Sequence, residues 1–161
     1  MGKKSKILYY TVLLVNLVCF ILDLLPINFP FFRISFAVSL ILIGLLLVVR
    51  AFTFKIDSSM FFGIVLFEFG ILNMVLYFTS IPTKQFWPYY LFALCIASLL
   101  TGLYFKDKLQ LKLSVLFLGF GLISLIFVQS LIKLWLFIVL MVAWFIGYFV
   151  INSILFKRGK K

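Results

Sequence analysis

Residues 34–54 read ISFAVSLILIGLLLVVRAFTF, and Arg50 is the one charged side chain in this stretch. A helix rises about 1.5 Å per residue, so roughly 20 apolar residues cross a hydrocarbon core that is about 30 Å thick. Backbone amides in that core must be hydrogen-bonded within the segment, and the stretch does not alternate as a barrel strand would. It therefore predicts a transmembrane helix.

Five more stretches of this kind fill the rest of the 161-residue chain, and the connections between them are short. A composition that is 66% hydrophobic lies well outside the range of soluble domains. We expect an all-α, polytopic integral membrane protein, in which six transmembrane helices form one compact antiparallel bundle and a single domain, residues 1–161. The predicted spans are residues 7–25, 34–54, 60–81, 86–105, 113–128 and 134–156.

The basic residues are distributed unevenly over the two ends of these spans. With the amino terminus inside, twelve of the 15 fall on the cytoplasmic side: Lys3, Lys4, Lys6, Arg50, Lys55, Lys106, Lys108, Lys112, Lys157, Arg158, Lys160 and Lys161. Only Arg33, Lys84 and Lys133 remain outside. Because short loops rich in Lys and Arg stay in the cytoplasm, we expect both termini there, in a plasma or inner membrane. This topology, together with attraction to anionic lipid headgroups at the cytoplasmic face, explains the net charge of +11, and we expect no nucleic-acid partner.

A weak repeat runs through the second, fourth and sixth spans. In each, an aromatic residue is separated by eleven residues from a glycine: Phe32 and Gly44, Tyr90 and Gly102, Trp135 and Gly147. This spacing suggests three helix hairpins of related design. The alternative has equal weight, since aromatic residues belong at the membrane interface and glycine is common in membrane helices.

The layout resembles the HdeD-like membrane proteins, a family of short-repeat six-helix proteins. The resemblance lies in the repeated hairpins, the basic ends and the stretches Phe117-Leu118-Gly119-Phe120-Gly121-Leu122-Ile123-Ser124 and Phe145-Ile146-Gly147-Tyr148. It implies six helices and a link to acid-stress resistance. It implies no catalytic residues, and the family has no settled molecular activity.

Glu68 is the one of the four acidic residues that is predicted to lie close to the membrane midplane. It is the ninth residue of the span 60–81, about 12 Å from the predicted cytoplasmic end. An ionised carboxylate near the midplane costs at least ~2.5 kcal/mol unless it is paired, protonated or hydrated. Two interpretations of Glu68 have equal weight. Glu68 either has a structural role, in an ion pair with Arg50 or as a protonated and hydrogen-bonded group, or it forms a site for a proton or a cation. Asn73 and Tyr77 would be secondary contacts of that site, although with Gly70 they equally fit close helix packing.

A second polar face lies in the first span, where Asn16, Cys19 and Asp23 are spaced at i, i+3 and i+7. We expect this face to point into the bundle. Asp23 lies near the outer interface, where hydration or pairing with Arg33 is favoured over a role in transport.

Little else in the sequence carries chemistry. The chain has no histidine, and Cys19 and Cys95 are isolated, so we expect no metal site and no cofactor. Asp23 and Glu68 lie at different depths, which argues against a catalytic carboxylate pair, and no catalytic residue is predicted. We expect a non-enzymatic structural, stress-associated or accessory component that forms helix–helix contacts in a homo-oligomer or a larger membrane complex. The alternative is a small homo-oligomeric, proton-coupled transporter or channel that uses Glu68.

Overall fold

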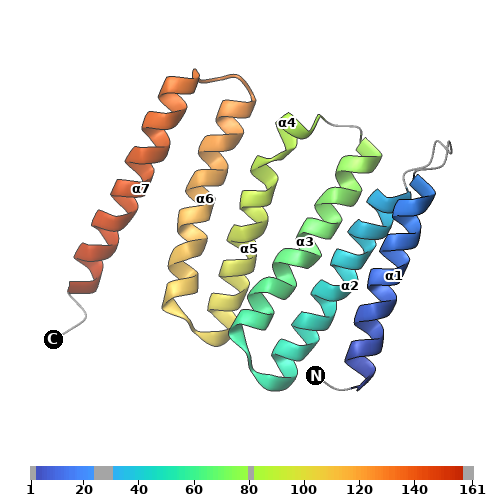
Figure 1. Ribbon diagram of the computed structural model, residues 1–161. Helices are drawn as coiled ribbons and strands as arrows, with labels where there is room; N and C mark the ends of the chain where they lie inside the picture. The colour runs from blue at the N-terminus through green and yellow to red at the C-terminus, as the bar shows by residue number, and fades with distance from the viewer. Residues whose placement is uncertain (1–2, 24–30, 80–81, 158–161) are drawn as a thin grey trace. The chain divides into compact units, whose positions relative to one another are not determined.

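The computed structural model describes residues 3–23, 31–79 and 82–157, and these residues form helices and turns with no strand (Figure 1). The helices are α1 (Lys3–Asp23), α2 (Phe31–Phe54), α3 (Asp57–Thr79), α4 (Thr83–Phe86), α5 (Pro88–Phe105), α6 (Lys108–Val128) and α7 (Leu134–Lys157). The all-α fold predicted from the sequence is thus confirmed for the described residues.

Within the described residues, five helical stretches are long and apolar enough to cross a membrane: Phe32–Phe54, Asp57–Thr79, Lys84–Phe105, Lys108–Val128 and Leu134–Ser153. Helix α1 contributes a shorter apolar stretch, Leu13–Leu22. The first of the six predicted spans therefore stays a prediction, while the other five correspond to observed helices.

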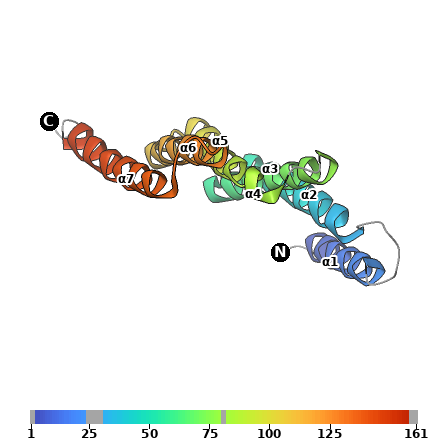
Figure 2. The same ribbon diagram turned by 90° about the horizontal axis from the view of Figure 1, so that it is seen from above.

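The chain divides into two compact units, Met1–Ser80 and Ile81–Lys161. In the first unit, α2 lies between α1 and α3, and its closer contact is with α3 (Figure 2). In the second unit, α6 lies between α5 and α7, and its closer contact is with α5. Each unit therefore combines one closely packed antiparallel pair with one more loosely attached helix.

Glycines allow the close approach of α2 and α3. A Cβ atom on Gly44 would lie 2.5 Å from the backbone nitrogen of Phe67 and 2.6 Å from the backbone oxygen of Gly63. A Cβ atom on Gly70 would lie 2.7 Å from the backbone oxygen of Ala37. All three distances are too short for non-bonded atoms, so any larger residue at Gly44 or Gly70 would push the two helix backbones apart. Small residues at such contacts are typical of membrane helices.

Gly102 has the corresponding position in the second unit, where a Cβ atom would lie 2.8 Å from the backbone nitrogen of Leu111 in α6. Gly147, the third glycine of the predicted repeat, has nothing within 4 Å of its Cβ position. Two of the three predicted repeat glycines therefore lie in tight helix pairs and the third does not. Two hairpins, α2–α3 and α5–α6, therefore share a common design, in which the repeat glycine lies against the backbone of the facing helix.

The two hairpins also share the geometry of their turns. Lys55 ends α2 and Lys106 ends α5 with left-handed backbone conformations, at φ angles of 54° and 55°. In both turns the residue after the lysine donates its N–H to the carbonyl oxygen five positions earlier, over 3.3 and 3.0 Å. This is the Schellman bond that closes a helix carboxyl end, and it reverses the chain within one or two residues.

An aspartate begins the next helix in each hairpin. The carboxylate of Asp107 caps α6 by accepting the N–H of Leu109 over 2.8 Å, and that of Asp57 accepts the N–H of Ser58 over 2.6 Å. These helices start at residues 57 and 108, whereas the predicted spans start at residues 60 and 113. The difference arises because the first turn of each helix is polar, so it is helical but does not belong to the apolar stretch.

The distribution of side chains is the reverse of that in a soluble domain. Large apolar side chains cover the exposed surface, including that of α7, whose apolar stretch contains no fully buried residue. Small residues occupy much of the interior: Ala37, Ser39, Ala51, Ala93, Ala97, Ser98, Thr101, Ser114 and Ser124. Small residues at contacts and large apolar residues outside are what a lipid environment favours. The described helices thus have the features of a helical membrane protein.

Candidate functional site

Glu68 lies at the midpoint of α3, with residues 57–67 before it and residues 69–79 after it. Its Oε2 atom is buried and has no hydrogen-bond partner within the described part of the chain. The closest backbone approaches of α3 to α2 are at Gly63, Phe67 and Gly70. At 100° per residue, Glu68 lies about 130° around the helix from this contact. The carboxyl group is therefore on the face of α3 that does not pack against α2.

Arg50 does not pair with Glu68, since the structure shows no ion pair between them. Arg50 follows Ser39 by eleven residues, which is three helical turns, so both residues lie on the face of α2 that is turned towards α1. Its side chain is exposed. In addition, Gly63 of α3 lies against Val48 of α2. Because α3 runs away from the turn that joins the two helices, Glu68 lies at least about 7 Å further from this turn than Arg50 does. Glu68 and Arg50 therefore lie on different faces and at different heights of the hairpin, and the ion pair that was one of the predicted alternatives does not form.

Asn73 and Tyr77 also lie apart from Glu68. They follow it by five and nine residues, which corresponds to rotations of about 140° and 180° around α3. The Asn73 Nδ2 atom donates to the backbone oxygen of Phe69 over 2.7 Å, and the Tyr77 ring contacts the Phe78 ring at 5.1 Å. The structure therefore does not assemble Glu68, Asn73 and Tyr77 into one polar site.

Asn16 joins α1 to α2. Its Nδ2 atom donates to Ser39 Oγ over 2.7 Å, and its Oδ1 atom accepts from Ser35 Oγ over 3.1 Å. The expectation that this face of the first span points into the helix bundle is met at Asn16. Cys19 is half-buried, and the side chain of Asp23 lies outside the described residues. The two serines were missed in the sequence, although their i, i+4 spacing opposite a buried amide was a usable signal.

A second polar contact joins α7 to α6 and was also missed. The Trp144 indole N–H donates to the backbone oxygen of Leu116 over 3.1 Å. The indole ring occupies the space beside Gly119, where a Cβ atom would overlap Trp144 Cε2. In both loosely attached helices, α1 and α7, a polar side chain therefore reaches across to the central helix of the unit and forms a hydrogen bond with it. A deep Trp in a membrane span, well away from the interface, was the available sequence signal.

Among the described residues, no three His, Cys, Asp or Glu side chains are grouped closely enough to hold a metal ion. Comparisons with protein-family models, with curated proteins and with solved structures found no match for this chain. The HdeD-like resemblance stays a prediction.

Proposed function

We propose that this protein is a non-enzymatic, multi-pass component of the plasma or inner membrane that acts through helix–helix contacts with a membrane partner or a second copy. The observation that supports this proposal is the use of the intramembrane polar groups. Asn16 and Trp144 form hydrogen bonds between helices of the same unit. The half-buried Glu68 is left on the face of α3 that does not meet α2.

The face of α3 that carries Glu68 is the proposed contact surface. Glu68, Ile71 and Val75 are spaced at i, i+3 and i+7, so they form one stripe along the helix. Ile71 and Val75 are both 40% exposed. An apolar stripe that begins with a carboxyl group at the midpoint of the helix suits a partner helix that offers a hydrogen-bond donor at the same depth, since a polar pair in hydrocarbon contributes about 0.6–1.7 kcal/mol.

A photo-crosslinking amino acid at Val75 tests the proposal in living membranes. We expect one discrete crosslinked species at Val75, and its loss when Glu68→Leu is added. The matched control places the same crosslinker at Ile146 in α7, which is 56% exposed and precedes Gly147, a residue with nothing within 4 Å of its Cβ position. Equal crosslinking at Val75 and Ile146, or a Val75 product that does not depend on Glu68, would reject the proposal.

A second candidate is a small homo-oligomeric, proton-coupled transporter or channel. It is favoured by the buried Glu68 Oε2 atom, which lacks a partner among the described residues, because intramembrane carboxyl groups commonly mark proton pathways. Proteoliposomes carrying the wild type or Glu68→Gln, driven by a pH gradient, distinguish the two functions. Proton flux that requires Glu68 would replace the accessory role by the transport role, whereas equal leak in both and in empty vesicles is the result expected of an accessory component.

A further inference from the structure

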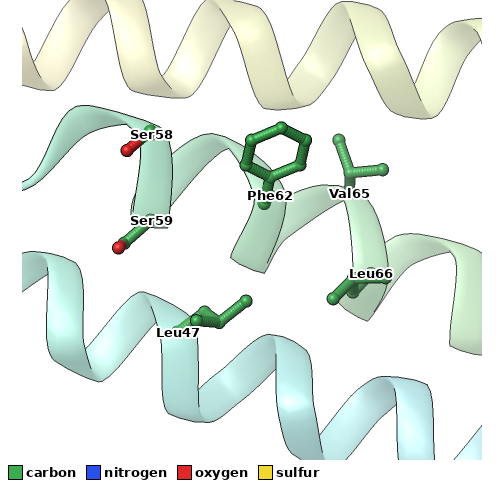
Figure 3. A pocket seen from close by; sticks show the side chains of 6 residues that line it. All are labelled: Leu47, Ser58, Ser59, Phe62, Val65 and Leu66. Carbon is green, nitrogen blue, oxygen red and sulfur yellow. The ribbon is translucent and has the colours of Figure 1, made fainter. Parts of the chain in front are cut away.

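A pocket opens on one side of the α2–α3 hairpin, near the turn that joins the two helices (Figure 3). This open pocket has a volume of about 380 Å³, which lies within the range of ~300–1,000 Å³ that small-molecule sites occupy. It is lined by Leu47, Ser58, Ser59, Phe62, Val65 and Leu66. Figure 3 shows the two serine hydroxyls at one end and the apolar side chains along the remainder of the pocket.

The polar end of this pocket is also the basic end of the hairpin. Lys55 forms the turn directly before α3, Arg50 lies in the last turns of α2, and both side chains are exposed. Asp57 is the one acid in residues 50–59, and its Oδ1 atom already accepts the N–H of Ser58. Two cations against one acid leave this end of the pocket net positive.

An amphipathic anion matches this arrangement. A phosphate accepts hydrogen bonds from the serine hydroxyls and is attracted by the two cations, whereas an acyl chain fits beside Leu47, Phe62 and Leu66. The pocket runs along α3 from its first turn towards its middle, so the apolar part lies deeper in the membrane than the polar part, as in a phospholipid of the surrounding leaflet.

We propose that this pocket binds one anionic phospholipid, with its phosphate at Ser58 and Ser59 near Lys55 and one acyl chain along Leu47, Phe62 and Leu66. The inference rests on the membrane-spanning arrangement of the hairpin, but not on a protein partner or on Glu68. A bound lipid would secure the turn of the hairpin to one leaflet.

Native mass spectrometry on the full chain, released from nanodiscs of equal phosphatidylglycerol and phosphatidylcholine with identical acyl chains, tests the proposal. We expect one retained phosphatidylglycerol and little phosphatidylcholine. Each cation removed in Lys55→Gln and Arg50→Gln should lower that preference about fivefold. Lys84→Gln with Lys133→Gln makes the same change of net charge in the second unit and should leave the preference unaltered. Equal retention of the two lipids by the wild type, or an unchanged preference in a variant that carries both Lys55→Gln and Arg50→Gln, would overturn the proposal.

Leu47→Trp provides a second test that leaves every charge in place. Filling the apolar part of the pocket should reduce retention of phosphatidylglycerol, with the helical circular dichroism signal unchanged. Inorganic phosphate at millimolar concentration should not displace the lipid. Displacement by phosphate alone, or full retention in Leu47→Trp, would identify a simple anion site and contradict the lipid assignment. Because no arm of this experiment involves a partner protein, its failure would leave the proposed accessory function untouched.

Discussion

At the scale of single residues, Asn16 is the polar side chain that connects α1 to α2. It exchanges hydrogen bonds with Ser39 and Ser35 across the α1–α2 contact. We expect Asn16→Ala and Ser39→Ala each to lower the free energy of unfolding, with a coupling energy of about 0.6–1.7 kcal/mol between them, since interhelical hydrogen bonds in membranes have that strength. A double-mutant cycle in a mixed-micelle unfolding assay measures the coupling. Strict additivity of the two changes would show that the bond makes no net contribution.

The residue scale also shows why part of the site could be predicted and part could not. The central position of Glu68 follows from counting residues along an apolar run, and the structure places it at the midpoint of α3. Whether Glu68 pairs with Arg50 could not be predicted, because the answer depends on which face of α2 meets α3. Glycines decide that orientation through backbone contacts across two helices, and an apolar run does not reveal which of its faces is the inner one.

At the scale of helix pairs, the glycine contacts give a prediction with a control inside the same chain. Gly44→Ala brings a methyl group to within 2.5 Å of the α3 backbone, whereas Gly147→Ala meets nothing within 4 Å. We expect Gly44→Ala to destabilise the protein by about 1–3 kcal/mol, as over-packing does. Gly147→Ala should be neutral, or stabilising by up to ~1 kcal/mol, because alanine favours helix. Equal effects of the two variants in an unfolding assay would argue against a close α2–α3 contact.

The hairpin turns give a prediction of the opposite sign. Lys106 has a left-handed backbone conformation, which costs an L-residue other than glycine about 1–2 kcal/mol. Lys106→Gly should therefore raise the free energy of unfolding by roughly 0.5–1 kcal/mol, after part of the gain is lost to the flexibility of glycine in the unfolded chain. Lys106→Ala removes the same charge and keeps the Cβ atom. If Lys106→Gly and Lys106→Ala had equal free energies of unfolding, relief of backbone strain could not be the cause of any stabilisation in Lys106→Gly.

Helix ends illustrate a further difference between sequence and structure. The carboxyl ends at residues 54, 105 and 128 coincide with the predicted ends of their spans, because a polar residue that stops the apolar run also stops the helix. The amino ends of α3 and α6 lie ahead of the predicted starts, since the Asp107 cap of α6 and the polar first turns of both helices extend them towards the preceding turn. Hydropathy reports the part of a helix that lies in hydrocarbon, whereas capping determines where the helix begins.

At the scale of the whole molecule, α1 determines the topology. Helices α2, α3, α5, α6 and α7 provide five stretches that can cross the membrane, so the two termini lie on the same side only if α1 also crosses. The basic residues favour six crossings with Lys106 inside and Lys84 outside. In a background with Cys19 and Cys95 replaced by alanine, a membrane-impermeant maleimide should label Lys84→Cys in intact cells, and should label Lys3→Cys and Lys106→Cys only after lysis. Labelling of Lys3→Cys in intact cells, with Lys106→Cys still protected, would place α1 outside the set of membrane-spanning helices. The Asn16 contact would then belong to a helix docked at the periphery of the membrane, where water competes for both serines, and its coupling energy should fall below the range expected for hydrocarbon.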